Sequence, residues 1–227
     1  MSYARRVSTK VTDSYRVLRE GIATGAYRLG EPLRAATIAG ELGISRTPVR
    51  EAFMRLASEG LVDYSPRYGA RVSDLRAEEL EELFELRAAI EAVAVRHACA
   101  RATPADVAHL RRLCTACHDA VGADDVDAVI AANIALHDAV NRLSGRERTI
   151  ELVDLLRDRA RPYRVLALYD DDERRASLAE HDDLVDLIEA GDADGAAALL
   201  GEHFARPLAR LMRYLGDRGR RPQRLAS

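Results

Sequence analysis

Arg46, Thr47 and Arg50 could recognise nucleic acid if they stand at the start of a helix. Arg46 and Arg50 are four residues apart, so they project from the same side of a helix. Each planar guanidinium can donate paired hydrogen bonds to guanine O6 and N7 or to a phosphate. Helical spacing predicts a separate, buried face made of Val49, Ala52, Phe53 and Leu56.

The turn before these arginines has residues that end one helix and begin another. Gly43 can adopt the left-handed conformation that ends a helix, and the Ser45 hydroxyl can accept an orphan amide of the following first turn. Pro48 falls in that turn, where its missing N–H costs nothing. The pattern predicts a helix-turn-helix. A small helical domain with two solvated arginines is the alternative.

A second group of residues could bind a metal. Asn133 and His137 are four residues apart on one predicted helix, and His181 and His203 lie on the last two predicted helices. Three imidazoles and a side-chain oxygen, if they converge, suit Zn²⁺, Ni²⁺ or Mn²⁺. On spacing alone, three histidines on separate helices are more often ordinary core or surface residues.

Several arginines could bind a carboxylate, because a guanidinium matches its two oxygens. Arg87 lies on the first helix of the second half, and Arg161 lies on the fourth. The alternative for Arg87 is an ion pair with a glutamate of the same domain. For Arg161 the alternative is a solvated helix face.

The run Cys114-Thr115-Ala116-Cys117-His118 matches the attachment pattern of c-type haem, and a Cys-x-x-Cys can also bind zinc or cycle redox. The run lies in the middle of an amphipathic helix, in a chain with no export signal. We therefore expect two packing cysteines and no haem.

Basic residues are concentrated in the first third of the chain. Residues 1–74 hold 12 Lys and Arg against 8 Asp and Glu, while the remainder holds 22 against 29, so the whole chain carries −3. This asymmetry is typical of a DNA-binding module joined to a domain that does not bind DNA. The expected parts are a flexible arm (1–8), a DNA-binding domain (9–74), a linker (75–76), a helical domain (77–218) and a disordered tail (219–227).

Periodicity and turn residues predict a mainly α protein. In the first domain we expect helices at 9–24 and 36–42 before the helix that carries Arg46, and Arg34 is a candidate phosphate or base contact. Two β-prone runs around a turn at 65–69 predict a hairpin. An all-α six-helix bundle is expected to follow, with helices at 77–101, 104–121, 124–143, 147–168, 174–190 and 192–215.

Composition excludes several classes of protein. The chain has 227 residues, 48% of them hydrophobic, which is enough to bury a core, but it has no apolar run that could span a membrane. Its first residues lack the apolar stretch of a signal peptide. We therefore expect a cytoplasmic, nucleoid-associated protein with reduced cysteines and no membrane partner.

The octet Ser-Arg-Thr-Pro-Val-Arg-Glu-Ala at residues 45–52 resembles the signature of GntR-family bacterial transcription regulators. The resemblance extends over residues 18–33 and 59–72. It implies a winged helix-turn-helix that binds a short inverted repeat in double-stranded DNA, with the hairpin tip in the minor groove or along the backbone. For Tyr68 at that tip, packing on the hairpin is an equal alternative. The expected DNA contacts are Arg34, Ser45, Arg46, Thr47, Arg50, Arg67, Tyr68 and Gly69.

Residues 85–91, the run from Asn133 to His137 and the segment around His181 are similar to the FCD ligand-binding domain of the FadR subfamily. Six helices indicate its VanR-like branch. The resemblance implies a divalent metal held by Asn133, His137, His181 and His203. The family usually has Asp as the first ligand. Since Asn133 is neutral, we expect weaker metal binding.

The resemblance implies a homodimeric regulator, most often a repressor. Its operator binding is expected to respond to a small organic acid, held through the metal and by Arg87 or Arg161. Two alternatives are a regulator whose signal is the metal itself, and a metal-dependent enzyme that uses the three histidines.

Overall fold

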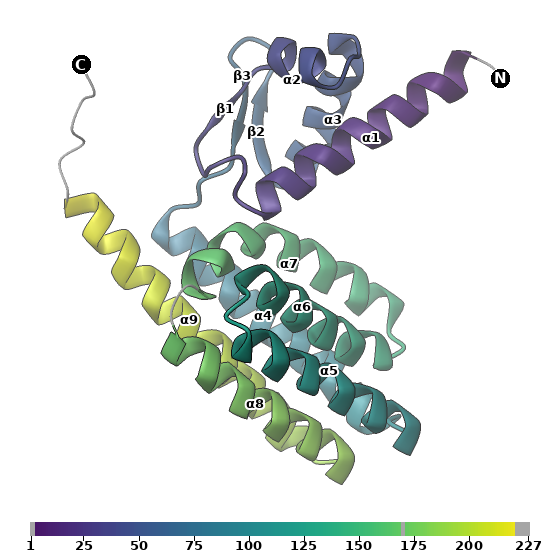
Figure 1. The fold of residues 1–227 in the computed structure, drawn as a ribbon, viewed down its shortest axis with the longest axis vertical. Helices are drawn as coiled ribbons and strands as arrows, with labels where there is room; N and C mark the ends of the chain where they lie inside the picture. The colour runs from purple at the N-terminus through teal and green to yellow at the C-terminus, as the bar shows by residue number, and fades with distance from the viewer. Residues whose placement is uncertain (1–2, 169–170, 221–227) are drawn as a thin grey trace. The chain divides into compact units, whose positions relative to one another are not determined.

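A computed structural model of the chain describes residues 3–168 and 171–220 (Figure 1). It divides into two compact units, and the boundary lies between Arg76 and Ala77. The expected linker, residues 75–76, lies immediately before that boundary. In the described part of the chain, no helix is both long and apolar enough to span a membrane.

From residue 3 onward, the first unit combines three helices with a small sheet. The helices are α1 (Tyr3–Ala23), α2 (Ala35–Glu41) and α3 (Arg46–Ser58), and the strands are β1 (Pro32–Leu33), β2 (Val62–Ser65) and β3 (Gly69–Val72). The strands pair antiparallel in the order β1-β3-β2. Apolar residues of all three helices and of the sheet form one core. The predicted apolar face of α3 is part of that core, at no more than 1% exposure: Val49, Ala52, Phe53 and Leu56.

Two elements of this unit differ from the sequence prediction. Helix α1 begins at Tyr3, so residues 3–8 continue the helix instead of forming the expected arm; residues 1–2 lie outside the described part. Strand β1 was not predicted, because two residues are too short for a periodic signal. Proline is tolerated in β1 because this strand forms the edge of the sheet and pairs only with β3.

The turn between α2 and α3 is tight, and Gly43 has a positive φ of 63°, as predicted. The amide of Ile44 returns to the Ala39 carbonyl and closes the end of α2. Ser45 occupies the N-cap position in an extended conformation, but its side chain makes no capping hydrogen bond, so that part of the prediction was wrong. The Ser45 side chain is exposed, and water can satisfy the first amides of α3 in its place.

In its described residues, the second unit consists of six helices, as predicted. They are α4 (Ala77–Cys99), α5 (Pro104–Gly122), α6 (Val126–Leu143), α7 (Glu147–Leu168), α8 (Asp171–Ala190) and α9 (Ala193–Arg220). Thr103 and Asp106 form a capping box at α5, and Asp192 accepts the Gly195 amide at the start of α9. Helix α9 extends beyond its predicted end, into the expected tail; residues 221–227 of that tail lie outside the described part.

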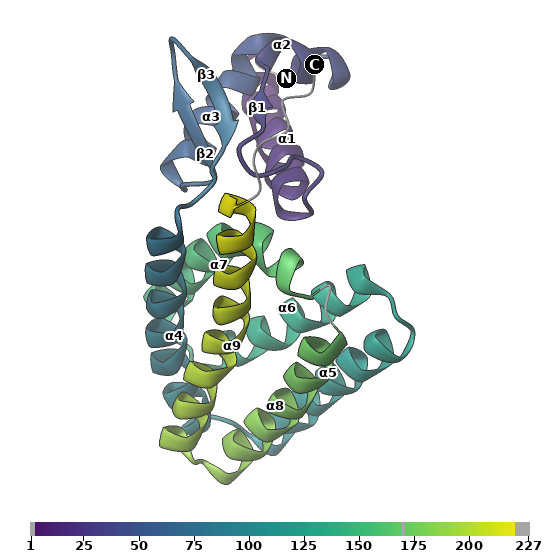
Figure 2. The same cartoon turned by 90° about the vertical axis from the view of Figure 1, so that its left-hand side faces the viewer.

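Helix α4 lies alongside α9 in the bundle (Figure 2). It packs against α6, α7, α8 and α9, and its buried face includes two charged residues, Arg87 and Glu91, as well as apolar ones. Buried polar side chains from α6, α8 and α9 accompany this pair: Asn133, His137, Asn141, Ser177, His181 and His203. The bundle therefore contains a polar interior that only mutual hydrogen bonding and ion pairing can stabilise.

Candidate functional site

The N-terminal end of α3 presents the predicted DNA-contacting residues to solvent. Arg46, Thr47 and Arg50 are all exposed, while Pro48 and Val49 between them are buried in the unit. Burial of the apolar face therefore fixes the rotation of α3, and the two guanidinium groups face outward. Arg34, the N-cap residue of α2, and Ser45 are also exposed.

The β2–β3 hairpin tip lies at the same end of the first unit as the α2–α3 turn (Figures 1 and 2). Tyr68 is 83% exposed, so it does not pack on the hairpin, which was one of its two predicted roles. The Arg67 guanidinium lies 5.5 Å from the Tyr68 ring centroid. Gly69 has a φ of 86°, a conformation that glycine adopts without strain and that allows the sharp turn into β3.

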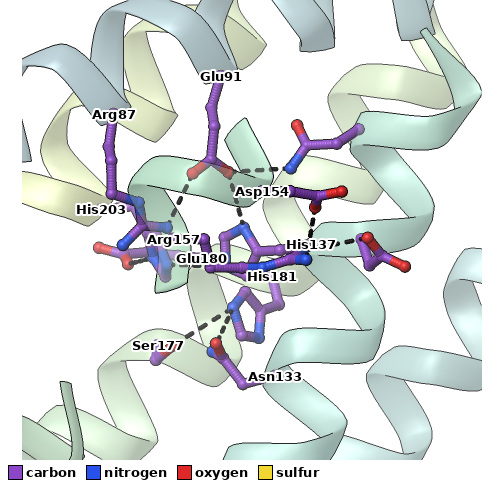
Figure 3. A network of polar contacts seen from close by, with 12 residues as sticks. Arg87, Glu91, Asn133, His137, Asp154, Arg157, Ser177, Glu180, His181 and His203 are labelled. Carbon is purple, nitrogen blue, oxygen red and sulfur yellow. Dashed lines mark hydrogen bonds and ion pairs between the residues drawn. The ribbon is translucent and has the colours of Figure 1, made fainter. Parts of the chain in front are cut away.

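The three predicted histidines meet inside the second unit (Figure 3). His137 of α6, His181 of α8 and His203 of α9 are each at most 5% exposed, and one ring nitrogen of each lies within 4.8 Å of the others. The shortest approach joins Nε2 of His137 to Nε2 of His203, at 3.1 Å. Residues that are 44 and 22 positions apart in the sequence thus form one cluster, called here the histidine cluster.

Asn133 borders the histidine cluster from one turn earlier on α6. It is 4% exposed, and its amide nitrogen lies 3.3 Å from Nε2 of His181, which Ser177 also approaches at 3.4 Å. The predicted ligand atom was the amide oxygen, whereas the nitrogen faces the histidine here. A half-turn of the amide group exchanges the two atoms without displacing the rest of the side chain.

Two carboxylates contact the outer sides of the histidine cluster. Glu180 Oε2 lies 2.6 Å from His203 Nδ1, and Glu91 Oε2 lies 3.6 Å from His137 Nδ1. Burial alone would raise the pKa of Glu91, but Arg87 and then His137 oppose it and hold that pKa well below its ordinary range. His203 and Arg206 likewise lower the pKa of Glu180 against the effect of its burial.

Arg87 is fully buried and pairs with Glu91 one turn away on α4, at 2.8 Å. The predicted alternative for Arg87, an ion pair within the domain, is therefore present. The pair occupies only part of the guanidinium, because Nε and Nη1 have no hydrogen-bond partner among the described residues. The guanidinium also lies 4.5 Å from the Phe204 ring centroid. A buried arginine with unused donors is costly, which marks this place as one suited to an anion.

The other predicted arginine, Arg161, is half-buried on α7, and its effector role stays a prediction. One turn earlier, Arg157 is committed to structural ion pairs with Asp138 and Asp154.

The two cysteines of the Cys-x-x-Cys run are packing residues on the buried side of α5. Burial raises the pKa of Cys114 to about 12 and that of Cys117 to about 11, so both thiols are protonated at neutral pH and poorly nucleophilic. Cys114 donates a weak hydrogen bond to the His181 carbonyl, at 3.6 Å. His118 lies on the surface, 2.8 Å from Asp182.

Sequence reasoning missed the roles of Glu91 and Glu180. The four-residue spacing of Arg87 and Glu91 indicates an ion pair, but nothing local to α4 shows that Glu91 also reaches α6. Glu180 directly precedes His181 in the chain, yet it contacts His203 on another helix. These roles depend on how the helices pack, which the sequence pattern does not specify.

We predict that Glu91→Gln lowers the free energy of unfolding by about 3–5 kcal/mol at pH 7, because it leaves a buried guanidinium without an anion. Since the pKa of Glu91 is lowered from 4.5 in the folded chain, its stabilising contribution is present above that value and is lost as the pH falls below it. Urea unfolding from pH 7 to pH 3 should show a smaller acid-dependent loss for the variant than for the wild type.

Glu85→Gln is the matched control, because Glu85 is an exposed glutamate on the same helix. Equal losses of stability in the two variants would contradict the importance of the buried pair.

Comparison with known proteins identifies the same two units. Residues 12–72 match the family described as bacterial regulatory proteins, gntR family, and residues 82–206 match the FCD domain. The chain is 33% identical over 185 residues to a probable D-xylose utilization operon transcriptional repressor of Paenarthrobacter nicotinovorans, covering 81% of this chain and 80% of that protein. It is 30% identical over 211 residues to the HTH-type transcriptional repressor GlaR of Escherichia coli K12, covering 86% and 93%.

The fold is similar to the solved structure of E. coli McbR/YncC, with a TM-score of 0.80 and 26% identity, covering 91% of this chain and 98% of that one. The predicted fold class is confirmed. The relatives carry the names of transcriptional regulators, which favours a regulator over a metal-dependent enzyme that uses the three histidines. The chain belongs to the GntR family of bacterial transcription regulators, in the FadR- and VanR-like subfamily that carries an FCD domain.

Proposed function

We propose that this protein is a dimeric repressor that leaves its operator when a small organic acid binds in the bundle together with a divalent metal. The observation that carries the proposal is the histidine cluster, three buried imidazoles with converging nitrogens, beside a buried arginine with unused donors. Two relatives are named as transcriptional repressors, which supports repression over activation.

The donor set fits a metal ion such as Zn²⁺, Ni²⁺ or Mn²⁺. The Nδ1 atoms of His137 and His203 face carboxylates, while their Nε2 atoms face each other at 3.1 Å. When both Nδ1 atoms carry protons, two lone pairs point at each other and repel, so this arrangement favours a cation between them. A bound metal would supply a Lewis acid that takes a carboxylate oxygen as a further ligand.

Arg87 supports an acid rather than a neutral effector. Its free Nε–H and Nη1–H are buried and can donate to a carboxylate, which would satisfy groups that water cannot easily reach. A neutral molecule would bring no negative charge to a site whose direct ligands, Asn133 and the histidines, are all neutral. For the same reason we favour the acid as the signal over a regulator whose signal is the metal alone.

The first unit is proposed to bind the operator. Arg46, Thr47 and Arg50 would read base edges in the major groove, and the hairpin tip at Arg67, Tyr68 and Gly69 would follow the backbone or the minor groove. Arg34 at the start of α2 and Ser45 at the start of α3, both exposed, would contact phosphates.

A dimer would present two such units to an inverted repeat, and the bundle has a surface suited to a second copy of this chain. Among the described residues of the bundle, the exposed large apolar side chains are Leu86 and Val93 on α4 and Leu152 and Leu155 on α7. Helices α4 and α7 pack against each other, so these four residues come from neighbouring elements. Two-fold association over them would bury apolar area from both chains.

Release of the operator requires that the effector bind unequally to two arrangements of the dimer. The effector must therefore prefer an arrangement in which the two DNA-binding units no longer match the half-site spacing.

Metal and acid should stabilise the folded chain together. A ligand present at a hundredfold excess over its Kd adds about 2.7 kcal/mol to the free energy of unfolding. In a thermal-shift screen of small carboxylates with and without Zn²⁺, Ni²⁺ or Mn²⁺, we expect the largest shift when both are present. His203→Ala should abolish that shift while leaving operator binding of the acid-free protein intact.

His118→Ala is the matched control, because His118 is a half-exposed histidine outside the cluster. A full shift in the His203→Ala variant would contradict the proposed site.

Arg50→Ala should weaken specific operator binding by about 1–3 kcal/mol and relax the preference at one base pair, because a bidentate base contact is lost. Arg28→Ala, which removes an exposed positive charge from the α1–β1 loop, is the control. Binding measured against a panel of single-base operator variants distinguishes a base contact from a phosphate contact. Uniform weakening across the panel would make Arg50 a phosphate contact.

Leu86→Glu should shift the chain from dimer to monomer in sedimentation velocity, because it places a charge in the proposed apolar interface. Operator affinity should fall with it, since one unit reads only one half-site. Ala100→Glu, a substitution at an exposed residue just beyond α4, should leave the dimer intact. A stable Leu86→Glu dimer would place the interface elsewhere.

A further inference from the structure

The proposed metal ligands carry no negative charge to balance that of a divalent cation. Three imidazoles and the Asn133 amide are all neutral, and all four side chains are at most 5% exposed. A divalent cation loses most of its hydration in such a place, so nearby negative charge is needed to offset the cost. An aspartate at position 133 would provide it directly, and asparagine does not.

Glu180 is the best-placed source of that charge. Its Oε2 lies 2.6 Å from Nδ1 of His203. An ionised carboxylate can only accept a hydrogen bond, so Nδ1 of His203 donates and its Nε2 is the ring nitrogen without a proton. That same Nε2 faces His137 in the histidine cluster, 3.1 Å from its partner nitrogen. The Glu180 contact therefore selects the tautomer and the ring orientation that a metal requires.

Glu91 plays a related part on the other side of the cluster. Its Oε2 lies 3.6 Å from Nδ1 of His137 and accepts a hydrogen bond from the Asn141 amide at 3.2 Å, while Oε1 pairs with Arg87. The fully buried Arg87 keeps this carboxylate ionised. Two of the three histidines thus have a carboxylate behind the nitrogen that points away from the cluster.

We propose that Glu180, assisted by Glu91, is a positioning residue of the metal site, and that these outer carboxylates provide the negative charge that Asn133 lacks. The inference rests on the proposed function, because it presupposes a metal in the histidine cluster. The inference adds to the proposed function a reason why a neutral residue is tolerated at position 133. Hydrogen-bonded outer carboxylates make an imidazole a stronger ligand, and their loss typically weakens metal binding by about 10–100-fold.

The test is Co²⁺ binding to the full-length protein, followed by competition with a chelator and by the visible absorption of the bound ion. Glu180→Gln should weaken Co²⁺ binding by about 10–100-fold and shift the absorption bands, because His203 loses its anionic partner. Glu189→Gln is the matched control on the same helix, since Glu189 is exposed and pairs only with Arg111 among the described contacts. It should bind Co²⁺ as the wild type does.

Asn133→Asp makes the test sharper. It should tighten Co²⁺ binding, and Glu180→Gln in that background should cost less than it does in the wild type, because the site then has a charge of its own. Equal affinities of the wild type and a folded Glu180→Gln variant would overturn the inference while leaving the metal site in place. Absence of Co²⁺ binding by the wild type and by Asn133→Asp would overturn the metal part of the proposed function as well.

Circular dichroism reports whether each variant folds. If Glu180→Gln does not fold, Glu180→Asp replaces it: the charge that pairs with Arg206 is kept, but the shorter side chain no longer reaches His203 equally well. Co²⁺ binding several-fold weaker than that of the wild type supports the positioning role, and unchanged binding refutes it.

Discussion

The bundle depends on the burial of a charged pair on its central helix. Arg87 and Glu91 are at most 1% exposed, so α4 can pack only if their charges are balanced inside the protein. Glu91 meets this need by contacting Arg87, Asn141 and His137 at once, which links α4 to α6. The polar interior therefore specifies one alignment of the helices more tightly than apolar packing alone would. It also leaves unused donors on Arg87, and these make the interior receptive to an anion.

The two units are stabilised in different ways. The first unit is small and builds its core from one face of each helix and one face of a short sheet. Its candidate DNA-contacting side chains are those that the core leaves outside, so their direction follows from the rotation of α3. In the second unit the candidate functional side chains lie within the core, where each must have partners. We therefore expect substitutions at the exposed end of α3 to affect DNA recognition with little effect on folding, and substitutions in the histidine cluster to affect effector binding and stability.

The sequence was sufficient to predict the features that depend on local spacing. The buried face of α3, the positive φ of Gly43 and the six helices of the bundle follow from periodicity and from turn residues. It was insufficient where a feature depends on segments distant in the chain. The pairing of Pro32 and Leu33 with β3, the contact of Glu180 with His203 and that of Glu91 with His137 all join separate elements. The histidine cluster itself was predicted only through the resemblance to a family, because three histidines on three helices have no periodic relation.

The amide of Asn133 gives the site a property that a carboxylate would not. With its nitrogen toward His181 it can donate a hydrogen bond to an unprotonated ring nitrogen, and after a half-turn its oxygen can accept a cation instead. The same side chain can thus serve the site with and without a cation, and the change between the two needs only a rotation about a single bond. Aspartate, which offers only acceptors when ionised, would suit the cationic state and strain the other. In the proposed metal site, Asn133 would therefore hold the ion less strongly than aspartate but allow faster exchange, as would suit a site that must return to its starting state after each signal.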